Sequence, residues 1–400
     1  MPAQPPPTPM DTDSKRQISP RHHASLLELA YLFLKLGTIA FGGPPAHIAM
    51  MEDELVSRRG WLTHKQFVDF LGAANLIPGP TSTEVAIYVG RVQAGWPGLV
   101  VAGSCFILPS GIMVAAFAWG YVRYGSLPQM AGVLYGIKPV VIALIVLAVV
   151  RLAGTAVKSV WLAVLGVVAV LAFALGTNEL LVLAGGGVLA GLVHGFRSGG
   201  KMKLSSTRAL FTLSAVSTGA TAASAFSLVA LFLVFLKIGA ILFGGGYVLI
   251  ALLRSNLVAR LGWISEAQLL DAVAIGQVTP GPISTAATFL GYVLGGLPGA
   301  AVATVAMFLP AFLFVAVSGP LIARLRQSPL AGAMLDGVNV AALALITVVA
   351  WQLSRAAIVD WITLVLAGGG LFLLTRYRVS STWLVLGGAL VGAAKVWLGL

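Results

Sequence analysis

Two Pro-Gly-Pro turns carry the residue types best suited to chemistry in this sequence. A proline ends one helix, a glycine permits the turn, and a proline fits the first position of the next helix. The backbone amides freed at that helix start carry about half a positive charge, and nearby hydroxyl groups add donors, so each turn predicts an anion-binding site. The candidate substrate-binding residues are Asn75, Pro78, Gly79, Pro80, Thr81, Ser82 and Thr83 at the first turn, and Gln277, Pro280, Gly281, Pro282, Ser284 and Thr285 at the second.

A purely structural kink in a packed helix is the alternative explanation of each turn. The two turns occur in register, however, and each is followed by a Ser-Thr pair, Ser82-Thr83 or Ser284-Thr285. This repetition favours binding over a kink. The spacing of Thr81 and Glu84 also fits a capping box, in which the two side chains close the first turn of the new helix.

Two Phe-Gly-Gly segments, at 41–43 and 243–245, interrupt apolar runs and form a second candidate site, with Gly42, Gly43, Gly244 and Gly245 as its residues. Pro44 follows the first segment and can start a new helix. A helix broken inside a membrane is tolerated where the break is buried in protein or lines a cavity, and it can then expose backbone groups to a ligand. Close packing of helices through small residues is the alternative, and both interpretations stay open.

Lys35 and Lys237 lie in the apolar contexts LFLKLG and VFLKIG, shortly before the two Phe-Gly-Gly segments. A cation at the centre of a bilayer costs at least ~2.5 kcal/mol, which argues for a purpose. We expect the two lysines to attract an anion, directly or at long range. Snorkelling of the side chains to the membrane interface is the alternative.

Four further side chains, His47, Asp69, Glu84 and Asp271, are candidates for carrying a coupling proton. Asp69 and Asp271 match between the two turns, each nine residues before its Pro-Gly-Pro. A helix cap at the membrane interface is the simpler explanation for this aspartate pair. His47 qualifies because an imidazole titrates near neutral pH.

Two matched positions differ in chemistry between the two parts of the chain. Glu84 has Ala286 as its counterpart, and Lys138 has Asn339, with Asp336 close by. Such asymmetry can mark a place where each half has a different task.

The elements that must position these residues come from two related halves. Residues 33–43 read FLKLGTIAFGG and residues 235–245 read FLKIGAILFGG, a displacement of 202 that also aligns the two Pro-Gly-Pro turns. After a one-residue slip, Pro109 matches Pro310 and Gly136 matches Gly337. We expect a disordered tail over 1–23, a first membrane repeat over 24–196, a basic Ser/Thr/Ala linker over 197–224 and a second membrane repeat over 225–400.

Composition places both halves in a membrane. Hydrophobic residues make up 58% and charged residues 10% of the chain, with a mean hydropathy of +0.96, whereas a soluble domain is about a quarter charged. Apolar runs near the ~20 residues needed to cross a bilayer recur along the chain. We therefore predict an all-α polytopic membrane protein with helices broken or re-entrant at the Phe-Gly-Gly and Pro-Gly-Pro segments. If the Pro-Gly-Pro segment enters and returns, each half crosses five times and the repeat is inverted; if both of its arms cross, it is not.

Several classes of function are excluded by the sequence. The net charge of +12 comes mostly from Lys and Arg in short loops beside apolar runs, which is typical of topogenic charge rather than nucleic-acid binding. The single Cys105 excludes an internal disulfide and a cysteine-based metal site. No metalloprotease, phosphate-binding-loop or Cys/His motif occurs, so we expect neither an enzyme nor an ATPase, and no metal or cofactor.

At these residues the chain resembles the chromate ion transporter family. FGGPPAHIAMMEDELV, RRGWLT and NLIPGPTSTEVAIYVG look like its first-half signature, and FGGGYVLI and LGWISEAQLLDAVAIGQVTPGPISTAATFLGY like its second. The resemblance extends over 26–400 and includes the two-domain repeat of the long-chain members, with Gly246 in place of Pro44 as a departure. It implies chromate efflux and chromate resistance at a bacterial inner membrane, without metal, nucleotide or haem. Sulfate or another oxyanion stays open, because these motifs do not discriminate.

Other function classes stay open beside a secondary transporter. An anion channel would need pore-lining rings from an oligomer, which a single sequence does not address. A membrane-embedded enzyme predicts an asymmetric cluster of titratable residues in one half, which the sequence does not show. We expect the partners to be a chromate- or sulfate-like oxyanion and the lipid bilayer, with no nucleic acid and with a homodimer left open.

Overall fold

The computed structural model describes residues 24–41, 43–125, 127–197, 226–243, 246–326, 328–377 and 379–398, and these ranges contain helices and no strand. The prediction of an all-α fold is confirmed. The predicted tail over 1–23, nearly all of the predicted linker over 197–224, and Gly42, Gly244 and Gly245 lie outside the described residues.

The first half opens with a broken helix. α1 (Leu26–Ile39) begins after Ser25, whose hydroxyl accepts a hydrogen bond from the Glu28 amide. α2 (Pro44–Glu52) begins directly after Gly43 with a proline at its first position, as the sequence predicts, and continues into the π-helical segment η2 (Asp53–Arg58). The rest of this half consists of α3 (His64–Ala74), α4 (Thr81–Tyr124), α5 (Pro128–Ala156), α6 (Val160–Ala174) and α7 (Glu179–Arg197).

The second half repeats this plan. Its elements are α9 (Leu228–Ala240), α10 (Val248–Leu253), the π-helical η5 (Arg254–Arg260), α11 (Glu266–Val278), the short 3₁₀ turn η6 (Ile283–Thr285), α12 (Ala286–Arg326), α13 (Pro329–Ala357), α14 (Trp361–Arg376) and α15 (Ser381–Trp397). In the described part of the chain, five helices, α4, α5, α7, α12 and α13, are long and apolar enough to cross a membrane. Together with the shorter apolar helices they make this a multi-pass membrane protein.

α4 and α12 each contain a sharp reversal. The backbone leaves helical geometry at Gly95 (φ +64°) in α4 and at Gly296 (φ +62°) in α12. The arm of α4 before the reversal, 81–93, folds back on the rest of the helix through Gly90. A Cβ atom on Gly90 would collide with the carbonyl oxygen of Gly98, so the two arms are in direct backbone contact.

α3 and the first arm of α4 form a re-entrant hairpin around the first Pro-Gly-Pro turn. α3 has 11 residues and is therefore about 16 Å long at 1.5 Å per residue, against ~30 Å for a bilayer core. The arm over 81–93 is similarly short. The turn between them is buried in protein at Pro78, Gly79 and Pro80. This arrangement agrees with the prediction of a re-entrant segment.

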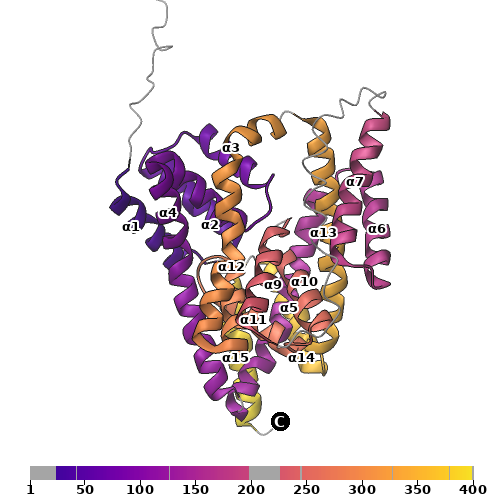
Figure 1. Cartoon of the computed structure of the whole chain (residues 1–400). Helices are drawn as coiled ribbons and strands as arrows, with labels where there is room; N and C mark the ends of the chain where they lie inside the picture. The colour runs from indigo at the N-terminus through magenta and orange to yellow at the C-terminus, as the bar shows by residue number, and fades with distance from the viewer. Residues whose placement is uncertain are drawn as a thin grey trace, which may run out of the picture.

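The two halves exchange their last helices. α6 and α7 of the first half pack on α13 of the second, and α14 and α15 of the second half pack on α5 of the first. Figure 1 shows α6 and α7 beside α13 at the upper right, and α14 and α15 at the lower end of the molecule. The repeats are therefore contiguous in sequence but interlocked in space.

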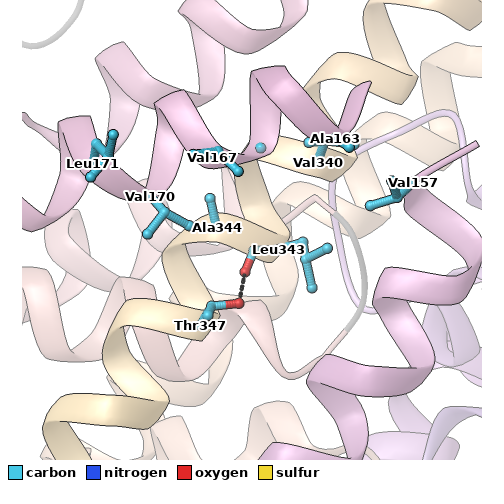
Figure 2. A pocket seen from close by; sticks show the side chains of 10 residues that line it. Val157, Ala163, Val167, Val170, Leu171, Val340, Leu343, Ala344 and Thr347 are labelled. Atoms are coloured by element: carbon cyan, nitrogen blue, oxygen red, sulfur yellow. Dashed lines mark hydrogen bonds between the residues drawn. The ribbon is translucent and has the colours of Figure 1, made fainter. Parts of the chain in front are cut away.

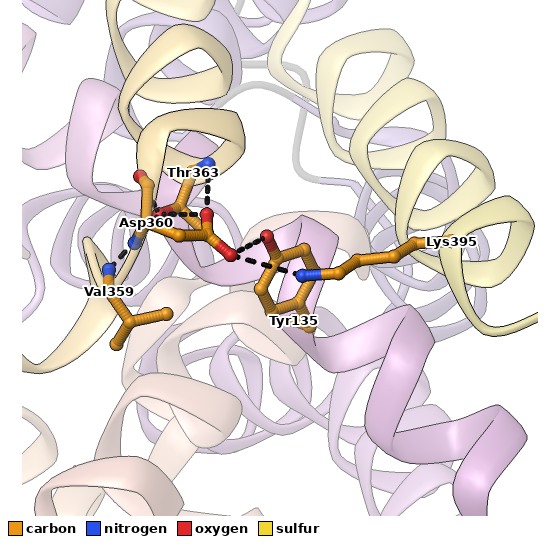
Figure 3. A network of polar contacts seen from close by, with 5 residues as sticks. All are labelled: Tyr135, Val359, Asp360, Thr363 and Lys395. Carbon is orange, nitrogen blue, oxygen red and sulfur yellow. Dashed lines mark hydrogen bonds and ion pairs between the residues drawn. The ribbon is translucent and has the colours of Figure 1, made fainter. Parts of the chain in front are cut away.

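Polar contacts anchor the exchanged helices. The hydroxyl of Tyr135 on α5 and the ammonium of Lys395 on α15 both donate to Asp360 Oδ2 at the start of α14, and the Thr363 amide donates to Oδ1 (Figure 3). These hydrogen bonds, from Tyr135 first and then from the Thr363 backbone, hold the pKa of Asp360 well below its ordinary value.

The matching position between α6 and α13 carries an ion pair instead. Lys158 Nζ lies 2.7 Å from Asp336 Oδ1. The repeat aligns Asp336 with Tyr135, and it aligns Lys158 with Val359, the residue just before Asp360, so the carboxylate stands on the opposite partner. Each exchanged helix pair is thus held at an equivalent place by different side chains.

Glycine contacts hold the same helices closely together. Gly136 on α5 meets Gly388 on α15, and Gly186 on α7 meets Gly337 on α13, which are equivalent contacts in the repeat. At both places a Cβ would collide with the opposite carbonyl oxygen. Such backbone contact between helices is typical of packing in lipid.

We predict that Gly136→Ala lowers the stability of the folded protein by about 1–3 kcal/mol, because the added methyl group forces α5 and α15 apart. Gly154→Ala in the same helix is the control, since a Cβ at Gly154 meets open space. Thermal unfolding in detergent micelles measures both variants. Equal unfolding midpoints for the two would contradict the interlocked packing.

Candidate functional site

Each Pro-Gly-Pro turn docks on the broken helix of the other half. The amide of Gly79 donates to the carbonyl oxygen of Leu242 at 2.8 Å, and the amide of Gly281 donates to the carbonyl oxygen of Ala40 at 2.9 Å. Both partners are displaced by 202 residues, so the two bonds are the same contact made twice. At the interface between the halves, each Pro-Gly-Pro turn therefore contacts the chain just before the Phe-Gly-Gly segment of the other half.

Glycine is required at the centre of each turn. Gly79 and Gly281 have positive φ angles of 149° and 92°. Residues other than glycine rarely adopt such angles. A Cβ on Gly79 would also collide with the Glu84 carboxyl group, and one on Gly281 would lie 2.6 Å from Ser110 Cβ. The turns are consequently packed tightly as well as turned sharply.

The hydroxyl groups at the turns divide into partnered and unpartnered ones. Ser82 Oγ lies 3.3 Å from His47 Nδ1, and the other imidazole nitrogen lies 3.0 Å from the Ala40 carbonyl oxygen. The hydroxyl group of Thr285 forms a hydrogen bond of 3.0 Å with Ser110 Oγ, which belongs to the opposite half. In the described residues, by contrast, Thr83 Oγ1 and Ser284 Oγ are buried without a hydrogen-bond partner.

Gln277 adds a third unpartnered donor, its buried Nε2, among the described residues at the end of α11. Asn75, its counterpart in the first half, is exposed at the end of α3. Thr81, at the first position of α4, is partly buried. The structure thus places the predicted turn residues together at two equivalent sites, with the outer members nearer the surface.

The predicted capping box of Thr81 and Glu84 is wrong. The N-cap of α4 is Pro80, one residue earlier, and no side chain caps the helix there. Glu84 instead lies completely buried with, in the described part of the chain, no hydrogen-bond partner for either carboxyl oxygen. The amides at the start of α4 are therefore left without a side-chain cap.

The lysines of the two broken helices are paired with side chains of the same half or the other half. Lys35 Nζ lies 2.5 Å from Glu54 Oε1 on η2. Lys237 Nζ lies 2.9 Å from Asn256 Oδ1 on η5 and 3.2 Å from Glu179 Oε1 on α7. The repeat aligns Glu54 with Asn256, so Glu179 supplies the carboxylate that the second half lacks. Pairing of this kind reduces the field that either lysine offers to an anion.

The matched aspartates are not helix caps, which corrects the simpler sequence interpretation. The N-caps of α3 and α11 are Thr63 and Ser265. Asp271 is buried within α11, where it accepts from Tyr121 Oη at 2.9 Å and lies 3.2 Å from Lys138 Nζ. Asp69 is partly buried within α3.

Sequence reasoning missed several of these partners. Glu54, Asn256 and Glu179 were not candidates, although the alignment of Glu54 with Asn256 by the repeat was a usable signal. Ser110 and Tyr121 had no signal of their own, because their importance comes from contacts with the opposite half.

A cavity of about 280 Å³ lies elsewhere, between α6 and α13. Its lining is apolar except for Thr347, whose hydroxyl already donates to the Leu343 carbonyl oxygen (Figure 2). It offers no donor for an anion, so we place the candidate site at the turns. In the described ranges, no three His, Cys, Asp or Glu side chains gather as metal ligands would.

A comparison with known protein families matches each half of the chain separately. The sequence model of the chromate transporter family matches residues 27–192 and 229–393. The chain belongs to the chromate transporter family. This confirms the resemblance drawn from the motifs, and it places both turns and both broken helices inside the matched regions. No solved structure matches the chain.

Three curated relatives of this family member match over most of their length. A chromate transport protein of Cupriavidus metallidurans is 34% identical over 393 residues, covering 96% of this chain and 97% of the relative. A probable chromate transport protein of Synechococcus elongatus is 32% identical and covers 93% of each chain. A chromate transport protein of Pseudomonas aeruginosa is 35% identical, and the match covers 78% of this chain and 77% of the relative. Relatives named as transport proteins imply a transporter rather than an enzyme.

We predict that Lys138→Met destabilises the transporter by about 3–5 kcal/mol, because Asp271 is left as an unpaired buried charge. Adding Asp271→Leu to this variant should restore most of the loss. Lys158→Met is the control, since its pair with Asp336 is largely exposed and contributes ~0–1 kcal/mol. Unfolding in detergent measures all three, and a double variant no more stable than Lys138→Met would contradict a simple ion pair.

Proposed function

We propose that this protein is a secondary transporter that exports chromate across a bacterial inner membrane and so confers chromate resistance. The observation that carries the proposal is the reciprocal docking of two Pro-Gly-Pro turns, each presenting a helix start with an unpartnered hydroxyl group, Thr83 Oγ1 or Ser284 Oγ, inside the protein. Discontinuous helices at matching places of two repeats are where transporters bind their substrates.

The donor set favours a tetrahedral oxyanion. Such a dianion accepts many hydrogen bonds, and hydroxyl groups beside uncapped amides supply them at a helix start. The relatives named as chromate transport proteins support chromate within this class. Sulfate is the second candidate, because it has the same shape and charge and the donors are of a kind that would bind either.

The membrane potential is sufficient to drive export. Moving one elementary charge across 100 mV is worth about 2.3 kcal/mol, so a dianion leaving an inside-negative cell gains about 4.6 kcal/mol. This corresponds to a concentration ratio on the order of 10³. Export then needs no nucleotide, which agrees with the sequence, whereas uptake would require at least two co-transported cations to cancel the charge.

The paired lysines have a different task from the turns in this proposal. Lys35 and Lys237 stabilise the broken helices through Glu54, Asn256 and Glu179, and they lower the barrier to the anion at long range when those pairs rearrange. Because the turn residues are buried, loading requires movement of the re-entrant hairpins against the broken helices. A channel would instead need a continuous open path past the turns.

We predict that Thr83→Val and Ser284→Ala each weaken chromate affinity by about 10- to 100-fold, because a hydrogen bond to a charged group contributes about 1.5–3 kcal/mol. Thr375→Val is the control, since its hydroxyl is exposed on α14 and bonds only within that helix. The concentration dependence of radiolabelled chromate flux in proteoliposomes measures the effect. Unchanged flux in the double variant would contradict a site at the turns.

We predict that an imposed potential alone drives chromate across everted membrane vesicles, in the direction set by its negative charge. Competition with sulfate in the same vesicles ranks the two oxyanions. Vesicles without the protein are the control. Flux that ignores the potential and follows only a pH gradient would show electroneutral exchange and overturn the driving-force argument.

A further inference from the structure

Glu84 lies against the first Pro-Gly-Pro turn in an environment that does not suit a carboxylate. The side chain is completely buried, and in the described residues neither carboxyl oxygen has a hydrogen-bond partner. It points at the turn itself, because a Cβ on Gly79 would collide with Glu84 Oε1. A buried polar group without partners requires an explanation, and a buried unpaired charge is strongly unfavourable.

In the part of the chain that the structure describes, no cation is paired with Glu84. Tyr88, one turn further along α4, is bonded to Ser318 of α12, and Arg91 donates to the Ala316 carbonyl oxygen. The other titratable or charged side chains described on the elements packed around this arm are Glu28, Tyr31 and Lys35 on α1, His47 and Glu52 on α2, His64, Lys65 and Asp69 on α3, and Tyr292 on α12. Among the described residues none of them forms a hydrogen bond or ion pair with Glu84.

The state of this carboxyl group decides whether an oxyanion can occupy the turn. An ionised carboxylate only accepts hydrogen bonds and repels a dianion, whereas a protonated one donates an O–H bond to it. Thr83 Oγ1, the neighbouring unpartnered hydroxyl, is a donor of the same kind. A dianion and a proton on Glu84 therefore favour each other's binding, and by linkage this coupling is reciprocal.

We propose that Glu84 couples transport to protons: its protonated carboxyl group donates a hydrogen bond to the oxyanion at the first turn, and the proton leaves to water on the side where the anion leaves. The inference rests on the proposed function and adds its coupling. A proton accompanies each dianion in the same direction, so the net charge moved is a single negative charge. Export down the membrane potential still proceeds, with a smaller electrical driving force.

The repeat supports a dedicated role. The counterpart of Glu84 is Ala286, completely covered at the equivalent helix start, so the fold does not need a carboxyl group at this position. The second turn instead has Gln277, whose buried Nε2 donates at every pH. One turn therefore contributes a pH-dependent donor and the other a constant one.

The test uses purified full-length protein in proteoliposomes with radiolabelled chromate outside or inside and a pH indicator in the lumen. The alkaline range is used, where chromate is a dianion. For the wild type we expect proton movement with chromate and an affinity that falls as pH rises, since fewer Glu84 side chains carry the proton. Glu84→Gln keeps a donor, so flux should persist without proton movement and without this pH dependence. Glu84→Ala removes the donor and should weaken affinity by about tenfold or more at all pH values.

The controls separate this proposal from the proposed function and from misfolding. Glu52→Gln removes an exposed carboxylate on α2 that pairs with His64 and should behave as the wild type. Wild-type flux together with proton movement that is unchanged in Glu84→Gln would overturn the role of Glu84 and leave chromate transport standing. Absence of chromate flux in the wild type would overturn both. Thermal unfolding confirms that each variant is folded, and Glu84→Asp serves as the folded substitute if Glu84→Gln is not, with its altered pH profile as the readout.

Discussion

Two backbone hydrogen bonds between the halves, Gly79 to Leu242 and Gly281 to Ala40, are the interaction on which the rest of the structure depends. A helix broken inside a membrane leaves amides and carbonyl groups without partners, and each such group costs several kcal/mol in hydrocarbon. Here the turn of one half supplies the donor and the break of the other supplies the acceptor. Each half thus supplies a hydrogen-bond donor to the break of the other, which favours folding of the two halves together.

The exchange of the last helices adds a second set of contacts between the halves. α6 and α7 pack on α13, α14 and α15 pack on α5, and α5, α13 and α15 in turn contact α11 of the second hairpin. Glycine contacts such as Gly136 with Gly388 bring these helices to backbone distance. The result is a frame that holds two equivalent helix starts inside the protein.

The two halves differ at several equivalent positions that carry titratable side chains. Glu54 becomes Asn256, and the missing carboxylate is supplied by Glu179 from the opposite half. Lys138 pairs with Asp271, whereas the corresponding position holds Asn339 and the matched Asp69 is only partly buried. Glu84 faces a turn whose equivalent has Ala286. A symmetric scaffold thus carries an asymmetric set of titratable groups, as expected when one passage must bind an anion and also respond to protons.

The features that could be predicted from the sequence are those that depend on the types and spacing of residues close together in the chain. The repeat, the apolar runs, the start of α2 at Pro44 and the two turns all follow from spacing and residue type. The pairing of Lys35 with Glu54 could not be predicted, because it depends on how the broken helix folds within its own half. The contact of Ser110 with Thr285 and the helix exchange could not, because they join residues that come together only when the two halves pack. The capping box failed for a local reason, since Pro80 occupies the cap position and leaves Glu84 free for another task.

The central claim is that the anion binds at the reciprocally docked turns. A structure of the protein with bound chromate, determined with the anomalous scattering of chromium, tests it most directly. The account predicts a chromium peak within hydrogen-bond reach of Thr83 or Ser284, beside the start of α4 or α12. A peak at Lys138 or in the apolar cavity between α6 and α13, with none at the turns, would contradict it.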